Sequence, residues 1–270
     1  MPSPIVTSLA RLRGYGATAL ISAVEPLNDG PLFLIPIGIR FVAVLVMLAI
    51  WRDVLGAHPG AAGMPLGAVL AYTLLAQALA PQLNFTSDLG EHLWDGSILG
   101  RFLWPQGLVA QVLATTAGRW VPDLALGTAP MLLGASLLHV SVAPASPIAL
   151  AAFLLSLGLA ITVGLAIDFA FTALTVSLRT TIWLIEQIRN ATTALLSGGI
   201  IPLALMPWGL GGVFGWLPFA ATASAPLRIY TGTGPILPLL AGQLLWALVL
   251  WPAVWLLWTR NREKVAGYGG

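Results

Sequence analysis

The chain has 270 residues, of which 58% are hydrophobic and only 8% are charged, and its formal net charge is +2. Soluble globular domains usually carry about 25% charged residues, so this composition excludes an ordinary soluble domain and predicts that most of the chain lies in lipid. It also excludes a nucleic-acid-binding protein, which needs basic residues clustered on a soluble surface. Because the chain has no cysteine, disulfides, thiolate metal sites and a cysteine nucleophile are excluded as well.

Long uncharged stretches determine the predicted helices. A helix needs about 20 mostly apolar residues to cross a bilayer. No Asp, Glu, Lys or Arg occurs in 54–87, 124–167, 190–227 or 229–259. The second stretch can hold two spans, with a hinge at the Ser- and Pro-rich residues 141–147. We therefore expect an all-α integral membrane protein with one transmembrane domain over residues 1–270 and six spans, at about 33–53, 65–84, 120–140, 147–172, 186–206 and 235–258.

The distribution of basic residues predicts the orientation. Residues 4–24, in the N-terminal segment 1–30, are expected to form a helix along the inner membrane surface. No cleavable signal peptide is evident, because the apolar stretch 17–24 is short and lacks a cleavage site. Cytoplasmic loops carry an excess of Lys and Arg. If both termini lie inside, two basic residues, Arg52 and Arg228, lie outside. Nine basic residues then lie inside: Arg11, Arg13, Arg101, Arg119, Arg179, Arg189, Arg260, Arg262 and Lys264. Arg40 is assigned to neither side in this comparison.

Residues 88–101, which we call the acidic island, interrupt the apolar sequence between the second and third predicted spans. The charge asymmetry places this island in the cytoplasm. Glu91, Leu93, Trp94, Ile98 and Leu99 have helical spacing and predict a short amphipathic surface, as in helices that lie in a partner's groove. A solvated loop helix without a partner is the alternative.

The predicted fifth span runs into a broken apolar segment, residues 197–234. Ser197, Gly198 and Pro202 weaken the helix, and Pro207, Pro218 and several glycines follow. Irregular backbone at membrane depth persists only where protein or a water-filled cavity shields it. We therefore expect a re-entrant hairpin in the outer leaflet that caps a pathway. An ordinary apolar outer loop is the alternative.

Motifs for chemistry within the chain are missing. The sequence contains no phosphate-binding loop, no His-Glu-x-x-His metal motif and no Gly-x-Ser-x-Gly elbow. The three histidines, His58, His92 and His139, lie in different loops or span ends. We therefore expect neither catalysis nor a metal site in this chain.

Ionisable residues near membrane depth are costly and usually functional. The favoured interpretation is an ion-pair network at the inner face, and the alternative makes Asp168 a cation-attracting group in a translocation cavity. The network is expected to include Arg119, Asp123, Asp168, Arg179, Glu186 and Arg189.

The order and spacing of several motifs resemble the permease subunits of type-2 ATP-binding-cassette exporters, in particular the viologen- or multidrug-exporter-like subgroup. After the second span there is an acidic stretch, a glycine, an apolar turn, Arg101 and then Pro105. Further along the chain come Ser197-Gly198, then Pro202 and, five residues later, Pro207. The tripeptide Leu-Pro-Phe at 217–219, the tripeptide Tyr-Thr-Gly at 230–232 and a final Gly-Gly complete the resemblance. Family members often carry Arg or Lys just before the island's glycine, where this chain has Trp94-Asp95.

The resemblance implies a function for each of the two unusual segments. The stretch 85–105 would be the cytoplasmic coupling helix, and the outer segment would be the gate. The coupling residues would be Glu91, Leu93, Trp94, Asp95, Gly96, Ile98, Leu99, Arg101 and Pro105, and the gate residues Ser197, Gly198, Pro202, Pro207, Leu217, Pro218 and Phe219.

The resemblance also implies partners, cofactors and a location. Two copies of a soluble ATPase subunit would bind ATP and Mg²⁺ and drive this permease, paired with an identical or paralogous permease, in the bacterial plasma membrane. The cargo would be a hydrophobic or amphiphilic compound such as a drug, a natural product or a lipid.

Three other functions remain open from the sequence. An ion-gradient-driven secondary transporter would need acids at the midplane or inverted repeats. A lipid-modifying membrane enzyme would need catalytic residues clustered at one depth. A non-transporting assembly subunit of a membrane complex would need neither acids at the midplane nor a cluster of catalytic residues.

Overall fold

The structure, a computed structural model, describes residues 4–28, 30–57, 64–104 and 106–266, and the side chains of 13–28, 30–57, 64–104 and 106–261. Every regular element in these ranges is helical, which confirms the predicted all-α class. Three described helices are long and apolar enough to cross a membrane, Gly30–Ala57, Pro147–Leu178 and Ile236–Asn261, whereas the apolar helix Leu66–Ala78 is shorter. The six-span arrangement stays a prediction.

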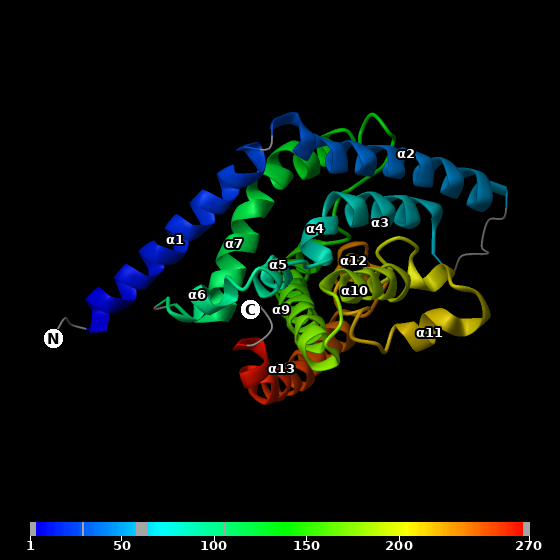
Figure 1. The fold of residues 1–270 in the computed structure, drawn as a ribbon. Coiled ribbons are helices and arrows are strands. Elements are labelled where there is room, and N and C mark those ends of the chain that lie inside the picture. The colour runs from blue at the N-terminus through cyan, green and yellow to red at the C-terminus, as the bar shows by residue number, and fades with distance from the viewer. Residues whose placement is uncertain (1–3, 29, 58–63, 105, 267–270) are drawn as a thin grey trace.

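The long helices pack in pairs (Figure 1). Helix α1 (Pro4–Asn28) runs along α7 (Leu108–Asp123) and reaches out to one side of the molecule. Helix α9 (Pro147–Leu178) packs along α13 (Ile236–Ala266) and against the short α12 (Ser224–Tyr230). Helix α2 (Leu34–Ala57), entered through the 3₁₀ turn Gly30–Phe33, packs against α3 (Leu66–Ala78).

The helix predicted over 120–140 is displaced toward the N-terminus. It begins at Leu108, passes through a π-helical turn at Leu124–Thr128 and ends with α8 (Ala129–Leu133). Its first half is more polar than a lipid-facing span, but Gln111, Thr115 and Thr116 are buried in the protein. Pro122 and Pro130 lack the amide hydrogen that an α-helix needs, so the regular hydrogen-bond ladder is interrupted near both.

Two other predicted helices are interrupted for similar reasons. The second span is divided into α3 and the short α4 (Ala80–Leu83), whose second residue is Pro81. The fifth was expected over 186–206, but α10 covers Ile182–Leu196. It ends there because Gly198 adopts φ +76°, a left-handed conformation that favours glycine and commonly terminates helices.

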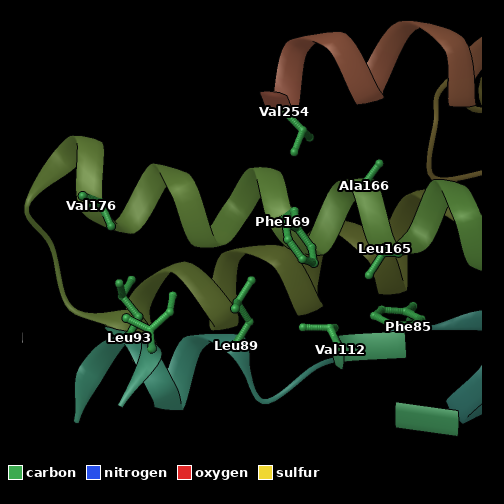
Figure 2. Close-up of a cluster of buried hydrophobic side chains, with 10 residues drawn as sticks. Phe85, Leu89, Leu93, Val112, Leu165, Ala166, Phe169, Val176 and Val254 are labelled. Carbon is green, nitrogen blue, oxygen red and sulfur yellow. The ribbon is translucent and has the colours of Figure 1, made fainter. Parts of the chain in front are cut away.

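A core cluster around α9 joins the island to three long helices. It comprises Phe85, Leu89, Leu93, Ile98, Val112, Leu165, Ala166, Phe169, Val176 and Val254. In Figure 2, Leu89 and Leu93 reach α9 from the short helix α5 (Leu89–Trp94), and Val254 approaches from α13 on the other side. A second cluster, with Val44, Leu74 and Met131 at its centre, joins α2, α3 and α8.

Much of the remaining apolar surface is exposed. Large side chains such as Ile148, Leu237, Leu248 and Trp255 point away from the protein on α9 and α13. A soluble monomer rarely exposes so much contiguous apolar surface, whereas lipid would cover it. The exposure agrees with the three membrane-length helices.

Gly118 provides a test of the α1–α7 pairing. A Cβ atom at Gly118 would run into the backbone carbonyl of Ala19, while one at Gly16 would meet open space. We expect Gly118→Ala to lower the free energy of unfolding by about 1–3 kcal/mol through overpacking. Gly16→Ala, its control, should be neutral or stabilising by about 0.5–1 kcal/mol because alanine favours helix. Thermal unfolding of the purified protein in detergent measures both, and equal effects of the two substitutions would contradict the pairing.

Candidate functional site

The acidic island folds into two short helices, α5 (Leu89–Trp94) and α6 (Ile98–Phe102). Asp95, Gly96 and Ser97 form the turn between them. The backbone amide of Ser97 donates to Oδ1 of Asp95 at 2.9 Å, and Gly96 adopts φ +73°. The turn needs glycine there because a side chain strains this conformation.

The inner face of the island is apolar and fully covered. Leu89, Leu93 and Ile98 are buried in the α9 cluster, with at most 1% of each residue exposed (Figure 2). Phe85, just before the island, packs closely against Gly164 of α9. A Cβ atom added at Gly164 would lie only 2.8 Å from the Cβ of Phe85. Leu93 and Ile98 are thus not on the exposed surface that was predicted for docking, and their part in coupling stays a prediction. Both side chains point into the core and hold the island in place.

The outer face of the island is also apolar, yet it is exposed. We call this set the apolar face, and it consists of the island residues Trp94 and Leu99 and of Phe102, Leu103 and Trp104, which directly follow the island. Leu103 is 86% exposed and Trp94 is 58% exposed. The acidic residues Glu91 and Asp95 are exposed beside Trp94. Trp94 and Leu99 were predicted for this surface, whereas residues 102–104 were missed although the same amphipathic spacing continues past Arg101. Pro105 lies outside the described residues.

A charge cluster around Asp88 joins the start of the island to its end. Nε2 of His92 lies 3.1 Å from Oδ2 of Asp88, and Nη2 of Arg101 donates to the same oxygen at 3.0 Å. Arg119 of α7 lies 3.4 Å from that oxygen and also pairs with Glu25 of α1 at 2.9 Å. Burial alone would raise the pKa of Asp88, but the His92 hydrogen bond and the Arg101 and Arg119 charges outweigh it and lower the pKa to about 2. Asp88 is thus held ionised and fastens α6 and α7 to the start of α5.

A second buried cluster joins the island to α9 and α10. Arg189 of α10 forms an ion pair with Asp168 of α9, and both side chains are at least 94% buried. Ser87, one residue before Asp88, donates to the other oxygen of Asp168. Arg189 also donates to Thr86 at 3.1 Å. Four side chains from three segments therefore converge at the point where the island begins.

The six residues predicted to form one ion-pair network at the inner face do not form a single network in the structure. Asp123 pairs with Arg40 of α2, beside the π-helical turn, rather than with an inner-face arginine. Asp123 was expected to open the third span, but it ends α7, because that helix begins at Leu108. Arg179 forms the left-handed cap of α9 with φ +50°. Within the described side chains, neither Arg179 nor Glu186 forms an ion pair.

Helix α10 also touches the island directly. A Cβ at Gly90 would lie 2.6 Å from Cδ1 of Ile182 and 3.1 Å from Oε1 of Glu186, so the absence of a side chain at Gly90 lets α10 come this close without displacing either side chain. At its other end, α10 reaches Ser197 and Gly198. The carbonyl of Gly198 accepts a hydrogen bond from the Tyr72 hydroxyl at 2.8 Å, and that of Ser197 accepts one from the Ser224 amide at 3.0 Å. One helix therefore contacts both unusual segments.

The predicted outer segment is irregular, as its prolines and glycines indicate. After Pro202 it forms the short turns Leu203–Leu205 and Pro207–Gly209, then α11 (Leu210–Phe214). Residues 217–219, Leu217, Pro218 and Phe219, lie in turns before α12. Trp208 is 92% exposed and Trp216 is 80% exposed. The segment thus consists of short helical turns and one short helix. The predicted re-entrant hairpin and the depth of this segment in a membrane stay predictions.

A cavity of about 390 Å³ lies between α2, α3, α4 and α10. Its wall is mostly apolar and includes Ala43, Met47, Leu83 and Ile200. Four neutral polar residues also line it, namely Gln77, Asn84, Thr193 and Ser197. None of its lining residues in the described chain is charged.

The comparisons add no relative. No family model, no curated protein and no solved structure matches this chain. Within the described residues, no group of three or more His, Asp or Glu side chains could hold a metal ion.

The Asp168–Arg189 pair gives a test of how the island is held. Arg189→Met leaves Asp168 buried and unpaired, and we expect a loss of about 3–5 kcal/mol in the free energy of unfolding. The double variant Asp168→Asn, Arg189→Met removes both charges and should regain most of that loss. Thermal unfolding in detergent measures the two variants side by side. If the double variant is as unstable as the single one, the ion pair does not carry this contribution.

Proposed function

We propose that this chain is the permease half of an ATP-driven exporter and that the acidic island binds a soluble ATP-binding-cassette ATPase. ATP and Mg²⁺ belong to that partner, and two ATPase copies act on two permease chains, identical or paralogous. The cargo is a hydrophobic or amphiphilic compound, and the location is the bacterial plasma membrane with both termini in the cytoplasm. The observation that carries the proposal is the exposed apolar face on an island whose base is buried.

The apolar face favours a protein partner over lipid. Exposed contiguous apolar patches mark protein or membrane contacts. Glu91 and Asp95 are exposed beside Trp94, and an anionic membrane surface repels such carboxylates. A protein groove with a polar rim accommodates both the tryptophans and the acids. Aromatic side chains of this kind are typical anchors of protein interfaces.

The connections of the island support a coupling role. Its base is held by the α9 cluster and by two charge clusters. A displacement of the island would therefore move α10 through the Gly90 contact with Ile182, and α10 leads to Ser197 and Gly198. ATP can shift the balance between two permease conformations only by stabilising one more than the other. A rigid island lets ATPase closure act on the helices in this way.

The uncharged cavity supports the proposed cargo. It lies between parts of the predicted second and fifth spans, which line the pathway in exporters that the chain resembles. Its apolar wall suits a hydrophobic compound, and the neutral polar residues provide hydrogen bonds without requiring a charge. An ion-gradient carrier is less favoured, because Asp168 is held by Arg189 and Ser87 instead of being free to exchange a cation.

Two pairs of exposed tryptophans test the docking proposal. We expect Trp94→Ala with Trp104→Ala to reduce recovery of a phosphate-loop ATPase that co-purifies with the wild-type chain at least about tenfold, because buried interface tryptophans commonly contribute about 2 kcal/mol or more. Trp208→Ala with Trp216→Ala, also exposed but in the outer segment, is the matched control. Co-purification in detergent with ATP gives the readout. Equal recovery of the ATPase with both double variants would contradict the assignment of the island as the docking site.

A further inference from the structure

A second cavity, of about 200 Å³, lies between the outer segment, α12 and the first turns of α13. Most of its wall is apolar or aromatic, including Trp216, Leu239 and Trp246. Arg228 is the only charged residue among those that line it. Nothing in the proposed export mechanism uses this cavity.

The guanidinium of Arg228 has neither a carboxylate nor a hydrogen-bond partner among the described residues. Its Nε would lie 3.1 Å from a Cβ at Gly234, so the absence of a side chain there leaves room for it. The other long polar side chain of the wall is already occupied. Gln243 accepts from the Ser156 hydroxyl at 2.8 Å and donates to the carbonyls of Ser156 and Ala221. Arg228 therefore presents an unneutralised positive charge to an apolar cavity.

The position of Arg228 is fixed by its helix. Its neighbours Leu227 and Ile229 are fully buried, and α12 packs against α3, α9 and α13. Thr233 also donates its amide to the Arg228 carbonyl at 3.0 Å. The backbone of Arg228 is therefore fixed, so its side chain starts from a defined position at the cavity wall.

The cavity follows α13 from its beginning into the span. Its lining runs from Pro238 to Trp246, which at 1.5 Å per residue is about 12 Å along the helix axis. Leu245 forms part of the wall and is 55% exposed, and Leu244 and Leu248 beside it are exposed on the same helix. The charge thus lies at the end of a membrane-length helix, and the apolar part extends along it toward surface that lipid would cover.

We propose that this cavity binds an anionic phospholipid of the leaflet in which α13 begins, with its phosphate at Arg228 and the upper part of one acyl chain along 242–246. Arginine is well suited to phosphate because its planar fork donates two hydrogen bonds. The small volume admits only part of one chain, and the remainder lies in the bilayer. The inference rests on α13 crossing a membrane, and it holds whether or not the chain exports anything.

Lipid exchange on the purified full chain tests the site. We would incubate the protein in micelles with equal amounts of phosphatidylglycerol and phosphatidylcholine of matched chains, and read retained lipid by native mass spectrometry. The wild type should prefer phosphatidylglycerol about fivefold, which corresponds to the contribution of one arginine near a lipid charge. Arg228→Gln should abolish the preference, and Arg228→Lys should keep part of it, because lysine retains the charge that distinguishes the two lipids but loses the bidentate fork. Arg52→Gln, at an exposed arginine that donates to the Leu138 carbonyl, should leave it unchanged.

A second variant fills the cavity while keeping the charge. A Cβ at Gly242 meets open space, so Gly242→Leu should fold and displace the acyl chain. We expect it to lose retained phosphatidylglycerol although Arg228 is intact. Unchanged retention in Gly242→Leu or Arg228→Gln would overturn the proposal. Tighter binding of inorganic phosphate than of phosphatidylglycerol would overturn it too, because the site would then recognise free phosphate and not a lipid.

Discussion

Two oppositely charged side chains, Asp168 and Arg189, are buried together where the acidic island meets α9 and α10. Removing such charges from water is costly, and the pair is favourable only when its remaining hydrogen-bonding groups are also satisfied. Ser87 and Thr86, just before the island, and Asn190 provide three such bonds, whereas Nε of Arg189 is buried without a partner. The position of the island therefore depends on this pair. The packing of Leu89 and Leu93 on α9 and the close approach of Gly90 to α10 follow from that position.

The island is built in opposite ways on its two sides. Its inner side is apolar and buried, and the Asp88 cluster with Arg101 and Arg119 locks it further. Its outer side is apolar and exposed, with acids beside it. On α9 and α13, lipid explains exposed apolar residues. On the short island helices, where exposed acids lie beside the apolar residues, we propose that a partner protein covers the tryptophans and Leu103.

The sequence predicted the helical class, the irregular outer segment and the amphipathic character of the island, because these depend on local composition and spacing. It could not tell which apolar residues of the island face inward. Leu93 and Ile98 carry the same local signal as Trp94 and Leu99, and only packing on α9 separates them. Likewise Asp123 was expected beside inner-face arginines. Its partner, Arg40 of α2, is 83 positions away in the sequence and is brought near Asp123 only by the fold.

The central claim is that the apolar face lies on the cytoplasmic side and is covered by an ATPase. Because the chain lacks cysteine, a single cysteine at Leu103 can be labelled with a membrane-impermeant maleimide without background. A cysteine at Trp208, in the outer segment, provides the reference. We predict that position 103 reacts only in inverted vesicles and is protected when a phosphate-loop ATPase that co-purifies with the chain is co-expressed, while position 208 reacts only in intact cells. Labelling of position 103 from outside, or no protection by the ATPase, would contradict it.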